Sequence, residues 1–329
     1  MGEGWLDGKG SGAGLVPSRI CLGTAAYGTG VSRDLALPVM DAYLAAGGNF
    51  LDTAHIYGAW APDGAGASEK TIGEWLRQSG ARDRVILATK GGHPLMGHMD
   101  QSRLARQDLE QDLAESLERL GVQHIDLYWL HRDDASRPVG DILESLAGFV
   151  GRGLIRAYGL SNWTVERIEA IQTCARSVGL PSPVASQIEF SLADQGERQR
   201  QPGGTEWCDE PTRRWHETMG MPICAFSSQA QGYFGAANAA WARGGFQGSP
   251  PRAGHDSPVN RQRLLRAIAL AEQKGCTTGQ VALAYLLCQR ARVVPIISTS
   301  NVEHLKESLA STSVHLTPEE CRALVAREQ

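Results

Sequence analysis

Short apolar runs alternate with longer amphipathic segments along almost the whole chain. In the segment 104–120, Leu109, Leu113, Leu117 and Leu120 recur at three- and four-residue steps, which is typical of a helix with one buried face. The apolar runs predict eight strands, at residues 19–23, 49–53, 85–89, 125–130, 155–160, 184–189, 222–226 and 293–297. The clearest amphipathic segments predict helices at residues 34–46, 68–77, 104–120, 141–151 and 164–178.

Strands that alternate with helices pair in parallel through right-handed crossovers. Eight such repeats predict an α/β fold, a (β/α)8 TIM barrel with long loops at its C-terminal face. The alternative is an open, doubly wound sheet, but no GxGxxG motif lies at an early strand-to-helix turn. We expect residues 17–329 to form one barrel domain, preceded by a flexible, Gly-rich leader at 1–16. The segments 192–221 and 229–260 interrupt the regular spacing, and long segments of this kind are often functional loops.

Composition and charge narrow the class of protein. The chain has 329 residues, of which 42% are hydrophobic and 21% charged, and its net charge is −4 with the basic residues scattered. This balance argues against a nucleic-acid or anionic-membrane partner. No run approaches 18 consecutive apolar residues and no signal-peptide pattern is present, so we expect a cytoplasmic protein. The seven cysteines form no CxxC pair or zinc-like spacing, which predicts reduced thiols and no metal site.

Four polar residues follow three consecutive predicted strands: Asp52 and Tyr57 the second, Lys90 the third and His131 the fourth. In a barrel these strand ends meet at the face where active sites lie. Alone, each residue has an ordinary interpretation as a turn, packing, solvated or structural residue. Together they can carry proton chemistry. The ammonium of Lys90 would lower the pKa of Tyr57, Asp52 would balance that ammonium, and His131 would donate a hydrogen bond to a carbonyl.

The motifs that hold these residues resemble those of aldo-keto reductases. Asp52-Thr53-Ala54 with Tyr57-Gly58 is similar to the family signature, as is the stretch 109–126 that leads to His131. The resemblance runs from about residue 19 to about residue 309. It implies an enzyme that interconverts a carbonyl (an aldehyde, ketone or keto-sugar) and an alcohol by hydride transfer with a nicotinamide cofactor. It places the catalytic tetrad on Asp52, Tyr57, Lys90 and His131, with Tyr57 as general acid and base.

Two alternatives stay open. The motif His131-Arg132-x-Asp134 resembles the branch that contains potassium-channel β-subunits and bacterial sugar- or ketone-reducing members. Channel β-subunits keep the cofactor site yet act chiefly as regulatory partners, so the chain could be a cofactor-binding regulatory subunit with little turnover. A barrel isomerase or aldolase with Lys90 as a Schiff-base nucleophile accounts for Lys90 but not for Tyr57 or Asp52.

The resemblance also implies a cofactor site built from the strand ends and the loops that follow them. One part of this site would hold the nicotinamide and its ribose, and another part would hold the phosphates and the adenosine. The implied residues are Gly23, Thr24, Ala25, Asp52, Ser161, Asn162, Gln187, Phe226, Ser227, Gln229, Gln231, Ser298, Thr299, Ser300, His304 and Glu307. Ser161 and Asn162 have a second interpretation as a helix N-cap.

The turn after the eighth predicted strand departs from the pattern of members that select NADPH. From Ser298 to His304 it contains no Lys or Arg to meet the 2′-phosphate. The hydroxyls of Ser298, Thr299 and Ser300, with backbone N–H groups at the next helix start, could still bind a phosphate. We therefore expect NADP (NADPH) as cofactor with a smaller advantage than usual, and NAD (NADH) as a plausible second cofactor.

Aromatic residues near the predicted tetrad suggest the substrate rim. Flat aromatic faces suit a sugar or a polycyclic ketone, so we expect a small-molecule carbonyl partner. The insertion at residues 60–64, directly after the predicted tetrad loop, is the expected specificity element. The rim residues expected from the sequence are Tyr27, Trp60, Trp129 and Trp163, with His93, Phe190 and Trp241 as further candidates.

Overall fold

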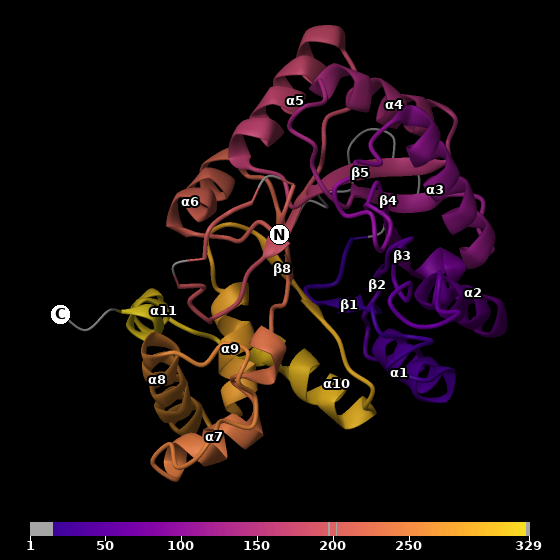
Figure 1. The fold of residues 1–329 in the computed structure, drawn as a ribbon. Helices are drawn as coiled ribbons and strands as arrows, with labels where there is room; N and C mark the ends of the chain where they lie inside the picture. Colours follow the sequence, from indigo (N-terminus) through magenta and orange to yellow (C-terminus); the bar gives the residue numbers. More distant parts are fainter. Residues whose placement is uncertain (1–15, 197, 202, 327–329) are drawn as a thin grey trace.

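Eight parallel strands close into a barrel at the centre of the molecule (Figure 1). The computed structural model describes residues 16–196, 198–201 and 203–326. Neighbouring strands pair in sequence order, and the first strand also pairs with the last, with Cys21 opposite Ile296. The strands are β1 (Cys21–Gly23), β2 (Phe50–Asp52), β3 (Ile86–Gly91), β4 (Ile125–Leu130), β5 (Ile155–Ser161), β6 (Ser186–Glu189), β7 (Ile223–Phe226) and β8 (Val293–Ile297). The predicted α/β barrel and its eight strands are confirmed.

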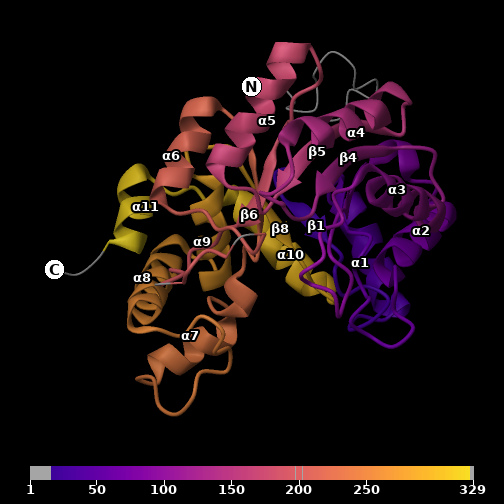
Figure 2. The same cartoon turned by 45° about the horizontal axis from the view of Figure 1, so that its top comes forward.

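Helices surround the strands, and the two views show them as an outer layer around the barrel (Figures 1 and 2). They are α1 (Arg33–Ala45), α2 (Ala67–Ser79), α3 (Arg106–Leu120), α4 (Val139–Gly151), α5 (Val165–Val178), α6 (Glu210–Met219), α7 (Ala236–Arg243), α8 (Pro258–Lys274), α9 (Thr278–Leu287), α10 (Val302–Ala310) and α11 (Pro318–Val325). Three short 3-10 turns are η1 (Arg82–Arg84), η2 (Ala230–Gly232) and η3 (Ser311–Ser313). None of the described helices is long and apolar enough to cross a membrane.

The two irregular segments are not loops throughout. The segment 192–221 contains α6, whose N-cap Asp209 accepts a hydrogen bond from the Thr212 backbone at 2.9 Å. The segment 229–260 contains η2 and α7. The predicted leader at residues 1–16 lies, apart from Val16, outside the described residues.

The barrel interior is filled by side chains from alternate strand positions. Trp129 of β4 is fully buried there, in contact with apolar residues such as Phe50, Leu127 and Cys224. The indole fits because its neighbour on β5, Gly159, has no side chain: a Cβ on Gly159 would lie 2.3 Å from the Trp129 ring. Trp129 therefore does not lie at the rim where the sequence suggested it, because its position on β4 directs it into the barrel.

One pair of cysteines differs from the expectation of reduced thiols. Cys288, which follows α9, and Cys321 in α11 are joined in a disulfide. The other five cysteines are free. The two partners are 33 residues apart in the sequence, and only the return of α11 to the outer helical layer brings them together.

The contact between Gly159 and Trp129 predicts the effect of one added methyl group. Gly159→Ala should lower the free energy of unfolding by about 1–3 kcal/mol, because the new Cβ overpacks the barrel interior. The matched control is Gly148→Ala in α4, where an added Cβ meets nothing within 4 Å. That change should raise stability by roughly 0.5–1 kcal/mol through helix propensity. Chemical denaturation measures both, and a Gly159→Ala protein as stable as Gly148→Ala would contradict the packing described.

Candidate active site

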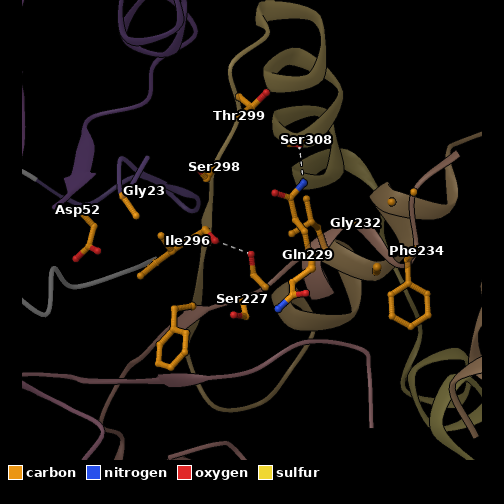
Figure 3. A pocket seen from close by; sticks show the side chains of 18 of the residues that line it. Gly23, Asp52, Ser227, Gln229, Gly232, Phe234, Ile296, Ser298, Thr299 and Ser308 are labelled. Atoms are coloured by element: carbon orange, nitrogen blue, oxygen red, sulfur yellow. Dashed lines mark hydrogen bonds between the residues drawn. The ribbon is translucent and has the colours of Figure 1, made fainter. Parts of the chain in front are cut away.

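A cavity of about 840 Å³ opens at the C-terminal ends of the strands. Its lining includes the last residues of four strands, Gly23, Asp52, Ser161 and Phe226, together with Gln187 within β6. Among the lining residues labelled in Figure 3, Asp52 and Gly23 lie on one side of the view and Gly232 and Phe234 on the other. Apart from Lys90 and Ser300, the catalytic and cofactor-binding residues expected from the sequence all line it.

A buried ion pair lies at the Asp52 end of the cavity. The Lys90 ammonium is 2.5 Å from a carboxylate oxygen of Asp52, and both side chains are almost completely withdrawn from solvent. Lys90 also donates to the Thr53 carbonyl at 2.7 Å and to the Tyr57 hydroxyl at 3.1 Å. These three acceptors use the three donors of the ammonium. An ammonium held in this way does not suit a Schiff-base nucleophile, which needs a free amine facing its ligand.

Burial and the nearby charge of Lys90 shift the pKa of the Tyr57 hydroxyl in opposite directions. Burial raises its pKa, the Lys90 ammonium lowers it, and the balance leaves the pKa of Tyr57 above its ordinary value. The sequence predicted the contribution of Lys90 but not the larger effect of burial. Burial also lowers the pKa of Lys90, yet the Asp52 carboxylate outweighs this and raises that pKa above its ordinary value. Tyr57 is therefore protonated and Lys90 charged at neutral pH.

His131 is buried beside Tyr57. Its ring meets the Tyr57 ring edge to face at 5.7 Å and the His93 ring at 4.7 Å between centroids. Burial, with the nearby Lys90 ammonium adding to it, holds the pKa of His131 well below its usual range. Its Nδ1 is buried and has no hydrogen-bond partner in the described part of the chain. The imidazole is thus neutral, and a proton on Nε2 avoids leaving a buried N–H group unsatisfied.

Side-chain amides surround the ion pair. Gln187 donates from Nε2 to the second carboxylate oxygen of Asp52 at 2.9 Å. Asn162 donates to the carbonyl of His131 at 3.2 Å and accepts from the Glu206 backbone at 3.1 Å. The backbone of Asn162 has a left-handed φ of 61°, which asparagine tolerates better than most residues. Asn162 therefore holds the end of β4 in place as well as lining the cavity.

The loop after β7 carries the other end of the cavity. Ser227 and Gln231 both line the cavity with left-handed φ angles, of 52° and 53°. Ser228 donates to the Ile296 carbonyl at 2.7 Å, and Gln229 donates to the Ser308 hydroxyl at 3.3 Å (Figure 3). These bonds tie the loop to β8 and α10.

The turn after β8 presents fewer free donors than the sequence suggested. Asn301 caps α10 and accepts hydrogen bonds from the backbones of Glu303, at 2.7 Å, and His304, at 3.2 Å. Two N–H groups expected to be available for a phosphate are therefore already satisfied. Ser300 is exposed and does not line the cavity, whereas Ser298, Thr299 and His304 do.

Arg252 places a cation in the cavity lining, whereas the turn after β8 contains none from Ser298 to His304. It lines the Gly232 end of the cavity, within 4 Å of the place a Gly232 Cβ would occupy. Its backbone is held by two hydrogen bonds with the buried Asn238 of α7, both 2.9 Å long. Sequence reasoning missed it because Arg252 lies in a Gly- and Pro-rich segment remote from the turn after β8.

The expected aromatic rim is only partly present. Trp60 is exposed, and its ring lies 6.1 Å from that of Tyr57. Tyr27 is buried and donates to the Thr299 carbonyl at 3.0 Å, while Trp163 is buried and donates to the Arg132 carbonyl at 3.3 Å. Neither Tyr27 nor Trp163 lines the cavity. Among the further candidates, Phe190 packs on Tyr285 and Trp241 on Phe246, whereas His93 contacts His131.

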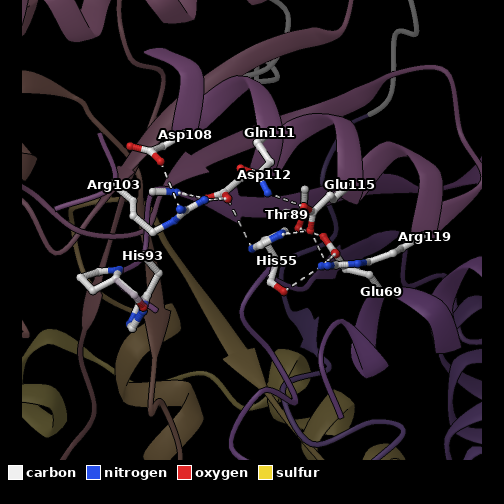
Figure 4. A network of polar contacts seen from close by, with 12 residues as sticks. His55, Glu69, Thr89, His93, Arg103, Asp108, Gln111, Asp112, Glu115 and Arg119 are labelled. Carbon is white, nitrogen blue, oxygen red and sulfur yellow. Dashed lines mark hydrogen bonds and ion pairs between the residues drawn. The ribbon is translucent and has the colours of Figure 1, made fainter. Parts of the chain in front are cut away.

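A polar network supports the loop between Asp52 and Tyr57 from outside (Figure 4). His55, within that loop, contacts Glu115 of α3 through Nε2 at 2.8 Å, and its backbone N–H donates to the Lys90 carbonyl at 2.9 Å. Arg119 of α3 donates to the His55 carbonyl at 3.1 Å and to Glu69 of α2 at 3.2 Å. The network fixes the loop against two helices and thereby fixes Tyr57 relative to Lys90.

Comparisons with known proteins identify the family of this chain. The sequence pattern that defines the Aldo/keto reductase family matches residues 19–328. The chain belongs to the aldo/keto reductase family. It is therefore an NAD(P)-dependent oxidoreductase, since that is the class of the family.

Relatives of this aldo/keto reductase occur in bacteria and fungi. It is 30% identical to the uncharacterized oxidoreductase YrpG of Bacillus subtilis, over 94% of this chain and 92% of that protein. It is 28% identical to the norsolorinic acid reductase stcV of Emericella nidulans, over 94% and 77% of the two chains. A solved aldo/keto reductase from Klebsiella pneumoniae, in complex with NADP and acetate, has the same fold with a TM-score of 0.68 and 23% identity, over 94% and 91% of the chains.

The depressed pKa of His131 predicts how the stability of this aldo/keto reductase varies with pH. A histidine that stays neutral in the folded chain stabilises it above the unfolded pKa of about 6.5, and this contribution is lost as the pH falls. The loss grows as the pH falls below 6.5, because the unfolded chain binds a proton that the folded chain does not. In His131→Asn, the free energy of unfolding should therefore fall less on acidification than it does in the unsubstituted protein.

The matched control is His216→Asn in α6. His216 is buried away from the cavity, and burial lowers its pKa to about 4, so its removal should reduce the acid loss similarly. Urea unfolding at pH 7.5 and pH 5 measures both effects. An unchanged acid loss in His131→Asn, with a reduced one in His216→Asn, would show that His131 is not held neutral.

Proposed function

We propose that this aldo/keto reductase reduces the carbonyl group of an aldehyde, ketone or keto-sugar, with Tyr57 as the proton donor. The observation that carries the proposal is the chain of contacts from Asp52 through Lys90 to Tyr57, which ends at the cavity wall. Lys90 does not line the cavity, and both carboxylate oxygens of Asp52 are engaged by Lys90 and Gln187, so the Tyr57 hydroxyl is the end of this chain that remains to meet a ligand. A general acid must lie within hydrogen-bond reach of the atom it protonates.

The residues divide the proton chemistry among them. Tyr57 is protonated before the reaction and transfers its proton to the carbonyl oxygen. The Lys90 ammonium, 3.1 Å away, stabilises the phenolate that this transfer leaves, and Asp52 keeps Lys90 charged. His131 is neutral, and its Nε2–H donates a hydrogen bond to the same carbonyl oxygen, which orients and polarises the substrate. In the direction of alcohol oxidation, the Tyr57 phenolate accepts the proton.

The cavity suits a nicotinamide dinucleotide. The bound cofactor supplies a hydride for the carbonyl carbon. At the Asp52 end, Ser161, Asn162 and Gln187 offer the hydroxyl and amide groups that a carboxamide requires. Elsewhere along the cavity, Ser227, Ser298 and Thr299 offer hydroxyls, Arg252 offers a guanidinium and His304 offers an imidazole, for phosphates. The Klebsiella pneumoniae relative binds NADP, and this supports NADP here.

The regulatory alternative has less support. A subunit that only binds cofactor does not need a buried ammonium beside Tyr57, and withdrawing that ammonium from water costs free energy. The chain is therefore proposed as an enzyme with turnover.

Removing the Tyr57 hydroxyl tests the proposed acid. Tyr57→Phe should lower kcat for aldehyde reduction by roughly 10²- to 10⁴-fold, the usual contribution of a general acid. Binding of NADPH, followed by quenching of protein fluorescence, should change little. Tyr158→Phe is the matched control, because its hydroxyl donates to the Pro181 carbonyl outside the cavity lining. A Tyr57→Phe enzyme that retains more than about a tenth of its turnover would remove Tyr57 as the acid.

The choice of cofactor tests the role proposed for Arg252. NADPH should be preferred to NADH by less than about a thousandfold in kcat/KM, or roughly 4 kcal/mol, because Arg252 is exposed and the turn after β8 adds no arginine or lysine. Arg252→Met should weaken NADPH binding about tenfold more than NADH binding. Arg290→Met, at a surface arginine outside the cavity, is the control. Equal losses for the two cofactors in Arg252→Met would exclude Arg252 as a partner of the 2′-phosphate.

A further inference from the structure

Arg132 lies beside the tetrad and takes no part in the proton chemistry described. It follows His131 directly after β4, and its side chain lines the cavity. One guanidinium nitrogen, Nη1, donates to the Gly204 carbonyl at 2.8 Å and lies 3.4 Å from the Thr205 hydroxyl. The Nε and Nη2 groups have no acceptor among the described residues. One edge of the guanidinium is thus held by the protein, and two donor nitrogens, Nε and Nη2, are left over.

No carboxylate balances the charge of Arg132 within the described ranges 16–196, 198–201 and 203–326. The two acidic residues next to it in the sequence are already engaged: Asp133 pairs with Arg167 at 2.8 Å, and Asp134 accepts from Ser136 at 2.6 Å. The groups with which Arg132 interacts electrostatically are Tyr57, His131 and His93. Tyr57 is protonated, and an imidazole is neutral or positive but not negative, so none of these groups supplies a negative charge before the reaction.

Other arginines with mostly buried side chains are paired differently. Each has a carboxylate within salt-bridge distance: Arg82 has Asp126, Arg103 has Asp112, Arg119 has Glu69, Arg167 has Asp133 and Arg263 has Asp194. Withdrawing a guanidinium from water without a counter-ion is unfavourable, and burial lowers the pKa of Arg132. A guanidinium in that state, facing a cavity, is poised for an anion that enters with the ligand.

We propose that Arg132 determines substrate specificity by binding a negatively charged group, a carboxylate or a phosphate ester, on the carbonyl compound that is reduced. This inference rests on the proposed function. The two unused donors of the guanidinium match two oxygens of such a group. The cofactor's own phosphates are assigned elsewhere, because Arg252 lies at the Gly232 end of the cavity whereas Arg132 neighbours Tyr57 and His131.

Matched pairs of charged and neutral aldehydes test the proposal. For the carboxylate arm, kcat/KM is measured for 2-, 3- and 4-carboxybenzaldehyde and for their methyl esters, with NADPH. For the phosphate arm, glyceraldehyde 3-phosphate is compared with glyceraldehyde. In at least one arm the unsubstituted enzyme should prefer the charged compound by roughly 10- to 100-fold, the effect of a charge-assisted hydrogen bond. The ring position of the best carboxybenzaldehyde then gives the distance from carbonyl to anion.

Three variants separate charge from structure. Arg132→Gln should remove the preference for the charged compound. Arg132→Lys keeps the charge but not the planar pair of guanidinium donors, so it should retain part of the preference. Thr205→Val removes a neighbour of Nη1 without changing charge, and the preference should persist. Two results would overturn the proposal. The first is an unsubstituted enzyme with equal kcat/KM for the charged and neutral aldehydes in both arms. The second is an Arg132→Gln variant whose kcat/KM falls by the same factor for charged and for neutral aldehydes.

Binding without turnover separates this inference from the proposed function. Benzoate and benzamide are titrated calorimetrically into the protein saturated with NADP. Benzoate should bind more tightly than benzamide to the unsubstituted protein, and Arg132→Gln should lose that difference. Absence of turnover for all the aldehydes would contradict the proposed function, whereas equal binding of benzoate and benzamide would contradict the anion site.

Discussion

The active site of this protein depends on one buried ion pair, between Lys90 and Asp52. Neither residue is stable alone in the barrel interior, because an isolated charge there would lose its hydration without compensation. Together, with the Thr53 carbonyl and the Tyr57 hydroxyl, they form a closed set of donors and acceptors. The rest of the site follows from this set: Tyr57 is held in place by the ammonium, and Gln187 is held by the remaining oxygen of Asp52.

The barrel makes the ion pair possible by joining residues that are far apart in the sequence. Parallel pairing brings the end of β2 beside the middle of β3, with Asp52 opposite Ala88, two residues before Lys90. The loop that carries Tyr57 is then fixed from outside by α2 and α3, through Glu69, Glu115 and Arg119. Strand order thus sets the position of the charges, and the helices set the position of Tyr57, the proposed acid.

The sequence predicts what is local and periodic. The limits of β4 and β8 agree with the pattern of apolar residues, and the tetrad follows from polar residues at strand ends. What it misses depends on contacts between distant segments. Arg252 reaches the cavity from a Gly- and Pro-rich stretch, Cys321 meets Cys288 only through the return of α11, and Asn301 occupies N–H groups that the sequence left available. Trp129 shows a different limit, because an aromatic residue at a strand can point into the barrel or to its mouth, and only the register decides.

The left-handed backbone of the loop after β7 has a consequence for how such a protein changes over generations. Ser227, Ala230 and Gln231 all adopt φ angles near 50° that glycine would adopt with less strain. Selection for thermal stability alone would favour glycine at these three positions. A lineage that keeps Ser227 and Gln231 instead retains the hydroxyl and amide that face the cavity. Strain in this loop therefore marks where folding and ligand recognition make opposite demands on the same residues.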